Sequence, residues 1–86
     1  MAKNIKSVNK SQEIECKTLK NILFASEITY AQIAKKIGIS ENAVNFKING
    51  KRSWWIEECV LVTKLLGYSD LIEVFPEIVE KYLKSA

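Results

Sequence analysis

The sequence predicts an all-α protein, a compact bundle of about five helices that contains a helix-turn-helix. Three observations support this fold class. Apolar residues recur at helical spacing along most of the chain, and capping residues and glycines divide it into segments of helix length. No stretch alternates polar and apolar residues as a half-buried strand does. With 86 residues, we expect a single domain with one small core.

The first helix is predicted after a polar N-terminal segment. Residues 1–12 are lysine-rich and lack sustained periodicity, so we expect a mobile basic arm that either follows a DNA backbone or serves as a solubilising terminus. The next segment has an apolar face at helical spacing, made of Cys16, Leu19 and Leu23. A helix is predicted over residues 13–27, with Glu13 and Glu15 at the end where acidic side chains are favourable.

A capping box predicts the start of the second helix. Thr29 suits the N-cap position, and Gln32 stands three residues later, as this motif requires. The inward face of this helix is expected to hold Ile33, Ala34 and Ile37.

A short turn then leads into a third helix. Gly38 can adopt the left-handed conformation that ends a helix, and Ser40 can cap the next one. This helix is predicted over residues 41–49, with Gly50 as its C-terminal stop. Two helices joined by a short glycine-containing turn form a helix-turn-helix, whose second helix can enter the DNA major groove.

A longer helix is predicted over residues 54–66, capped by Ser53 and ended by Gly67. Its apolar residues fall into a core stripe (Trp55, Cys59, Val62, Leu66) and a second stripe (Trp54, Leu61, Leu65). So wide an apolar surface must be covered on more than one side.

The cover is expected from the C-terminal segment or from a second subunit. Ser69 is predicted to cap a short turn that reaches Phe75, the end of a DNA-binding domain over residues 13–75. Pro76 suits the first position of a C-terminal helix over residues 76–86, whose apolar face is Ile78, Val79, Tyr82 and Leu83. This helix either packs on the domain or, with the second stripe, forms the interface of a homodimer.

The helix over residues 41–49 has an unusual outward face. At about 100° per residue, its inward side is Ala43, Val44 and Ile48. Asparagine can pair with adenine N6 and N7, and an aromatic ring can contact the thymine methyl. The outward side of this helix holds Asn42, Asn45, Phe46 and Asn49. Alternatively, these asparagines are incidental and Phe46 packs on Trp54 or the turn. The candidate base-reading residues are Ser40, Glu41, Asn42, Asn45, Phe46 and Asn49.

A second group of residues is expected to contact DNA phosphates. Lys47 lies at the edge of the apolar face, where its stem can pack while its ammonium extends outward. The candidate phosphate contacts are Thr29, Tyr30, Lys35, Lys47, the Gly50 N–H, Lys51 and Arg52. Residues 1–52 carry ten Lys or Arg against four Asp or Glu, a net of +6, whereas residues 53–86 carry three against six, a net of −3. The basic half therefore contains the helix-turn-helix, as expected if that half faces phosphates.

The composition argues against several other functions. The chain has no histidine and two cysteines, so a Cys-His nucleophile pair is impossible, and no catalytic residue, metal site, cofactor or small-molecule ligand is expected. Cys16 and Cys59 are expected to be reduced and buried in the core. No apolar run of about 18 residues and no signal peptide is present, so no membrane association and a cytoplasmic location are expected.

Three segments within residues 16–75 share a known pattern: T-Y-A-Q-I-A-K-K-I-G-I-S, A-V-N-F-K-I-N-G-K-R-S and L-L-G-Y-S-D-L. They resemble the lambda-repressor-like DNA-binding domains, the XRE/Cro group of small phage and bacterial regulators. Ala34, Gly38, Ile39 and Val44 match the structural positions of that family. Lys47 stands where many members have a buried aliphatic residue, and Trp54 replaces a frequent proline.

The resemblance implies a transcriptional regulator, of the repressor or Cro type, that occupies operator DNA as a dimer on inverted repeats. It assigns phosphate anchoring to Thr29 and Tyr30, and base reading to Ser40, Glu41, Asn42, Asn45 and Phe46. A second hypothesis is an interaction module that keeps this fold but binds another protein, for which exposed Phe46 and Trp54 would speak. An enzyme is the third and weakest hypothesis.

Overall fold

The computed structural model describes residues 14–85, which form six helices and no strand. The helices are α2 (Lys17–Ser26), α3 (Tyr30–Ile37), α4 (Glu41–Ile48), α5 (Ile56–Leu65), α6 (Leu71–Val74) and α7 (Pro76–Ser85). The predicted all-α class is confirmed, whereas the predicted arm over residues 1–12 lies outside the described residues. None of the described helices is long and apolar enough to cross a membrane.

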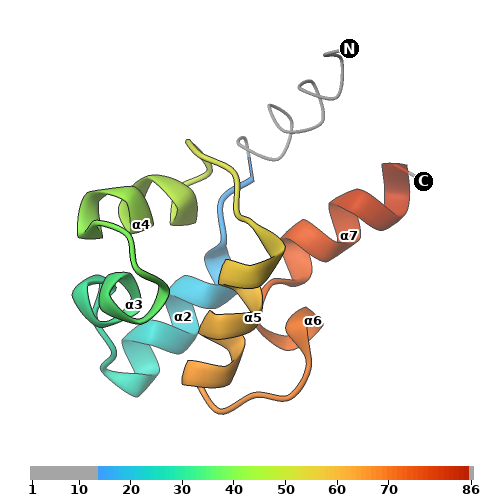
Figure 1. Ribbon diagram of the computed structural model, residues 1–86. Helices are drawn as coiled ribbons and strands as arrows, with labels where there is room; N and C mark the ends of the chain where they lie inside the picture. Colours follow the sequence, from blue (N-terminus) through green and yellow to red (C-terminus); the bar gives the residue numbers. More distant parts are fainter. Residues whose placement is uncertain (1–13, 86) are drawn as a thin grey trace.

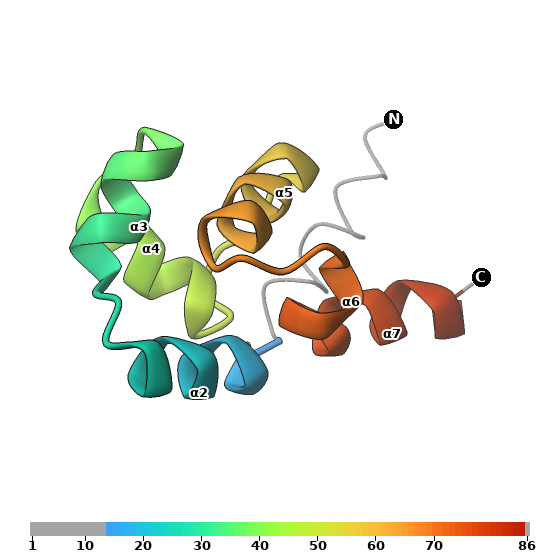
Figure 2. The ribbon, with the colours of Figure 1, turned by 90° about the horizontal axis from the view of Figure 1, so that it is seen from below.

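The helices surround one core. In Figure 1, α3 and α4 lie on one side of α2 and α5, and α6 and α7 lie on the other. Figure 2 shows the same order from below, with α7 extending away from the other helices. The buried side chains that meet in the centre are Cys16, Leu19, Leu23, Ile33, Ala34, Val44, Ile48, Cys59, Val62, Val74 and Phe75.

Helices α3 and α4 begin where their capping residues predict. The Gln32 N–H donates to the Thr29 hydroxyl (3.2 Å), and the Gln32 side chain accepts from the Thr29 N–H (2.8 Å), which confirms the capping box. The Ala43 N–H donates to the Ser40 hydroxyl (3.0 Å) at the start of α4. Gly38 ends α3 with φ at 81°, the left-handed conformation that its sequence position predicts.

Helix α2 begins four residues later than predicted. Cys16 precedes it, and its N–H donates to the carbonyl of Ile48 at the end of α4 (2.8 Å). Cys16 is held in a non-helical conformation (φ −89°, ψ 75°), so Glu15 does not lie in the first turn as expected, and Glu13 lies outside the described residues. A carboxylate from α7 takes that place, because Glu77 Oε2 accepts from the N–H (3.0 Å) and the hydroxyl (2.7 Å) of Thr18.

Helix α5 begins two residues later than predicted, and this exchanges the roles of the two tryptophans. Trp55 is extended (φ −84°, ψ 148°), and its N–H donates to Glu58 Oε1 (2.9 Å), so Ser53 is not the cap. Successive side chains of an extended segment point to opposite sides. Trp54 therefore turns inward and packs edge-to-face on Phe75, with ring centroids 5.1 Å apart. The predicted core residue Trp55 is instead 68% exposed.

The C-terminal segment returns to the core only in part. Asp70, rather than Ser69, caps α6, because its side chain accepts from the Ile72 N–H (3.2 Å). Helix α7 begins at Pro76 as predicted and contacts α2 and α6. Of its predicted apolar face, Ile78 and Val79 are half-buried, Leu83 is 67% exposed, and the Tyr82 side chain lies outside the described part.

Candidate nucleic-acid interface

Helix α4 divides into an inward and an outward side, as its sequence predicts. Ala43, Val44 and Ile48 are buried in the core. On the other side, Asn42 is exposed and Phe46 is 39% exposed. We call the side chains of Asn42, Asn45, Phe46 and Asn49 the outward face of α4. This face combines amide groups with one aromatic ring, so it offers hydrogen bonds and apolar contact to a ligand.

Two members of the outward face are bonded to each other. Asn45 and Asn49 are half-buried, one helical turn apart. The Asn49 side-chain N–H group donates to the carboxamide oxygen of Asn45 (2.8 Å) and to its backbone carbonyl (2.9 Å). A carboxamide oxygen has two lone pairs, so the Asn45 oxygen still accepts a second bond while its own N–H group donates. Asn49 thus orients the carboxamide of Asn45.

The first residues of α4 are also accessible. Ser40 and Glu41 are both exposed. The Ser40 oxygen accepts the capping bond from Ala43, which leaves its hydroxyl proton for a donor role. Glu41 lies in the first turn, where its negative charge is favourable to the helix dipole.

A shallow hollow of about 610 Å³ brings the beginnings of α3 and α4 next to α2. Its lining includes the predicted residues Thr29, Tyr30 and Glu41. It also includes Lys20 and Asn21, which the sequence pattern does not single out. The ammonium of Lys20 forms an ion pair with Glu15 and lowers the pKa of that exposed carboxyl. The sequence places Lys20 and Asn21 on the polar side of the first predicted helix, which was the only indication that they could contact a ligand. Tertiary packing is what places them beside Tyr30.

Three of the predicted phosphate contacts are exposed cations. Lys35 lies in the last turn of α3, and Lys51 and Arg52 lie shortly after the end of α4, beyond Asn49 and Gly50. All three side chains are accessible to a ligand in the described structure. In the sequence, Thr29, Tyr30 and Lys35 therefore precede the outward face, and Lys51 and Arg52 follow it.

Lys47 does not present its charge to a ligand, contrary to the prediction. Its side chain is 3% exposed, and its ammonium donates to the Ser53 carbonyl (2.7 Å) and forms an ion pair with Glu58 Oε1 (3.0 Å). The same ammonium lies 5.9 Å from the centre of the Trp54 ring. The stem packs as expected, but the charged end points inward because Glu58 at the start of α5 supplies a buried counter-charge.

The Gly50 N–H is likewise not available as a phosphate donor. Gly50 is buried, and its N–H donates to the Lys47 carbonyl (3.3 Å). A Cβ atom at this position would lie 2.8 Å from the backbone of Ile14. The backbone just before α2 therefore lies directly against the residue that follows the end of α4. Ile14 and Gly50 are 36 positions apart, so the sequence pattern does not reveal this contact.

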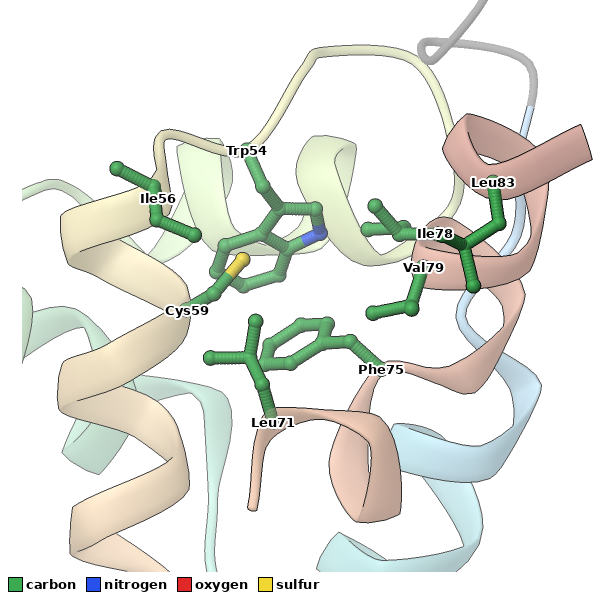
Figure 3. A pocket seen from close by; sticks show the side chains of 8 residues that line it. All are labelled: Trp54, Ile56, Cys59, Leu71, Phe75, Ile78, Val79 and Leu83. Atoms are coloured by element: carbon green, nitrogen blue, oxygen red, sulfur yellow. The ribbon is translucent and has the colours of Figure 1, made fainter. Parts of the chain in front are cut away.

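A second hollow lies on the opposite side of the molecule. It is an apolar groove of about 440 Å³ between α5 and α7 (Figure 3). Trp54 and Phe75 lie between the two helices, and Ile56 and Leu83 lie on either side of the opening (Figure 3). The eight lining residues are Trp54, Ile56, Cys59, Leu71, Phe75, Ile78, Val79 and Leu83. Of the predicted second stripe, Trp54 lines this groove and packs on Phe75, whereas Leu61 and Leu65 are not among the lining residues.

The thiols of Cys16 and Cys59 are free, buried and held in the protonated form. Burial raises the pKa of Cys16 to about 11, partly offset by the Trp54 indole, and raises the pKa of Cys59 to about 12. Protonated thiols are poor nucleophiles and poor metal ligands. Within residues 14–85, no three Cys, Asp or Glu side chains are grouped as a metal site requires.

Comparison with known proteins finds no matching family model, no matching curated protein and no matching solved structure.

Proposed function

We propose that this chain is a sequence-specific DNA-binding regulator of the lambda-repressor-like type, which occupies operator DNA as a homodimer and places α4 in the major groove. The observation that carries the proposal is the composition of the outward face of α4. It combines amide groups and one accessible aromatic ring on a helix whose other side is fully used by the core. These are the groups that read adenine and the thymine methyl in the major groove.

The surroundings of α4 supply the contacts that would hold it on a duplex. Lys51 and Arg52 are exposed shortly after the helix, and Lys35 is exposed at the end of α3. The capped starts of α3 and α4 lie together beside Lys20. Cations and helix N-termini bind phosphate oxygens and fix the register of a protein without reading sequence.

The salt dependence of binding to random duplex DNA tests this proposal. Each phosphate contact releases counterions, so the logarithm of affinity is expected to fall with the logarithm of salt concentration, by about 0.9 per contact. Lys51→Ala should reduce that slope by about 0.9. Lys64→Ala, at an exposed lysine of the acidic half, is the matched control and should leave the slope unchanged. Absence of duplex binding at low salt would refute the proposal.

Selection of bound sites from random DNA tests the sequence-specific part. We expect recovered sites to contain inverted repeats whose half-sites are about one helical turn apart. Recovery of unrelated sequences would leave only non-specific DNA binding.

The protein-interaction hypothesis was based on exposed Phe46 and Trp54, and the structure exposes Trp55 in place of Trp54. Trp54 is packed on Phe75 rather than exposed, which leaves Phe46 as the accessible aromatic residue of the pair. The duplex titration distinguishes the two functions, since an interaction module without phosphate contacts shows no steep salt dependence.

A further inference from the structure

A buried ion pair connects the last turn of α4 to the first turn of α5. The side chains of Lys47 and Glu58 are 3% and 13% exposed, and their charged groups are 3.0 Å apart. Lys47 also donates to the carbonyl of Ser53, in the connection between the two helices. Glu58 Oε1 in turn accepts from the N–H of Trp55. One carboxylate oxygen therefore serves both helices.

The aromatic neighbours extend this connection to the far side of the core. The Lys47 ammonium lies 5.9 Å from the centre of the Trp54 ring, within the range of a cation–π contact. Trp54 packs on Phe75, the residue that follows α6. The end of α4 is thus fixed to α5 and to the end of α6 by groups of defined geometry.

Stability alone gives no reason for this arrangement. Burying an ammonium and a carboxylate costs solvation free energy, and apolar replacements of buried ion pairs are often neutral or stabilising. An aliphatic residue at position 47 would continue the apolar side formed by Val44 and Ile48. The charged pair instead fixes the position of Lys47 relative to α5, because charge-assisted hydrogen bonds hold their atoms within a narrow range of distances.

The position of Lys47 affects the outward face of α4, because Lys47 directly follows Phe46 and lies two residues after Asn45. Side chains on one helix rotate together, so fixing Lys47 fixes the orientation of the outward face. A rotation of about 20° moves a side-chain tip about 6 Å from the helix axis by about 2 Å. Hydrogen bonds to bases tolerate only about 0.5 Å, so a rotation of this size changes which bases are read.

We propose that the Lys47–Glu58 pair is a positioning device that sets the rotation of α4, and so determines sequence specificity without touching DNA. This inference rests on the proposed function, in that Asn45 and Phe46 are taken as base-reading residues. It replaces the role of phosphate contact that the sequence suggested for Lys47.

Three variants test the proposal by separating discrimination from phosphate contact. Lys47→Met keeps the stem without the charge, and Glu58→Gln keeps an acceptor for Trp55. The double variant Lys47→Met/Glu58→Gln leaves no buried charge unpaired. We expect each to lower the ratio of selected-site to random-duplex affinity about tenfold, the effect of about one lost base contact. We expect all three to keep the wild-type salt slope.

The double variant and Lys51→Ala serve as controls. The double variant should recover most of the stability lost in Lys47→Met, so that unfolding does not explain its poor discrimination. Lys51→Ala should lower the salt slope and keep the discrimination. The proposal is overturned if Lys47→Met lowers the slope as Lys51→Ala does, or if the double variant discriminates like the wild type.

Backbone amide NMR of the free protein tests positioning without DNA. In the double variant, we expect shifts along residues 42–49 on the outward side of α4, with little change in α3. Shifts confined to the immediate neighbours of residues 47 and 58 would contradict the proposal. If the wild type failed to bind duplex DNA, the proposed function would fall while this measurement still decided whether the pair orients α4.

Discussion

Asn45 and Asn49 are joined by hydrogen bonds, so the orientation of one carboxamide depends on the other. The bonded pair restricts the side chain of Asn45 before any ligand arrives. A restricted side chain loses less conformational entropy on binding than a mobile one. Under the proposed function, we therefore expect Asn45 to have the stronger base-reading role and Asn49 a supporting role.

Asn45→Ala is expected to reduce affinity for the selected site by about tenfold and to relax preference at one base pair, because a paired hydrogen bond to adenine is lost. Binding to random duplex should change little. Competition titration against a panel of single-base variants measures both effects. Unchanged discrimination would show that the base-reading role was wrongly assigned.

The thiols of Cys16 and Cys59 are expected to reduce stability at alkaline pH. In the unfolded chain they ionise near pH 9.0, whereas burial keeps them protonated in the folded chain up to about pH 11 and 12. Above pH 9 the unfolded state therefore binds fewer protons. The free energy of unfolding should then fall as pH rises from about 9 towards the folded pKa values, by up to about 1.4 kcal/mol per pH unit for each thiol.

Urea unfolding at pH 8 and pH 10 measures this loss. The variant Cys16→Ala/Cys59→Ala is the control, since it differs from the wild type only in lacking the two thiols. We expect a smaller pH-dependent loss in the variant. Equal losses in both proteins would contradict the role of the thiols.

At the scale of helices, chain segments distant in sequence complete the ends that local residues leave open. Cys16 offers no side-chain cap for α2, and Glu77 from α7 accepts the Thr18 N–H in its place. Gly50, just after the end of α4, allows the backbone of Ile14 to lie directly against it. One contact links α2, and the other links the residues just before it, to elements far along the chain.

Glu77→Ala is expected to destabilise the fold by about 1–2 kcal/mol, the effect of losing a helix cap. Glu80→Ala changes an exposed carboxylate of the same helix and should have an effect within about 0.5 kcal/mol. Urea unfolding of the two variants provides the comparison. Equal stabilities would mean that the Thr18 contacts do not contribute to holding α7.

Gly50→Ala is expected to be more destabilising than Gly38→Ala. Both glycines have φ at 81°, so each substitution places an L-residue in the left-handed region, at about 1–2 kcal/mol. At Gly38 the added Cβ meets open space, whereas at Gly50 it meets the backbone of Ile14 at 2.8 Å. Thermal unfolding of both variants measures the difference. Similar losses would contradict the close approach at Gly50.

At the scale of the whole molecule, the apolar groove is the surface that suits the proposed homodimer. Ile56 and Leu83, at its opening, are 64% and 67% exposed. Helix α7 extends beyond the other helices on this side (Figure 1). A groove and a projecting apolar side chain on one face are self-complementary, as a twofold interface requires. The occupant we propose is therefore α7 of a second copy.

Sedimentation equilibrium is expected to show a concentration-dependent dimer for the wild type. Leu83→Glu should shift it towards the monomer, because a carboxylate would have to be buried in the partner's groove. Glu80→Ala is the control on the same helix and should leave the association unchanged. A strictly monomeric wild type, both free and on inverted-repeat DNA, would refute the dimer.

Sequence by itself determined the features that depend on residues three or four positions apart. The capping box of Thr29 and Gln32, the left-handed Gly38 and the cap at Ser40 all involve such short separations. They fix where α3 and α4 begin, and helical periodicity fixes which side of α4 faces the core. Most of the candidate base-reading face could therefore be predicted.

Tertiary structure decided the features that depend on distant residues. The start of α2 depends on Ile48, and the burial of Lys47 depends on a carboxylate eleven positions away at Glu58. The exchange of Trp54 and Trp55 follows from packing on Phe75. Local patterns hold no information about such partners, because a side chain's preferred direction depends on the charge or ring that the folded chain brings to it.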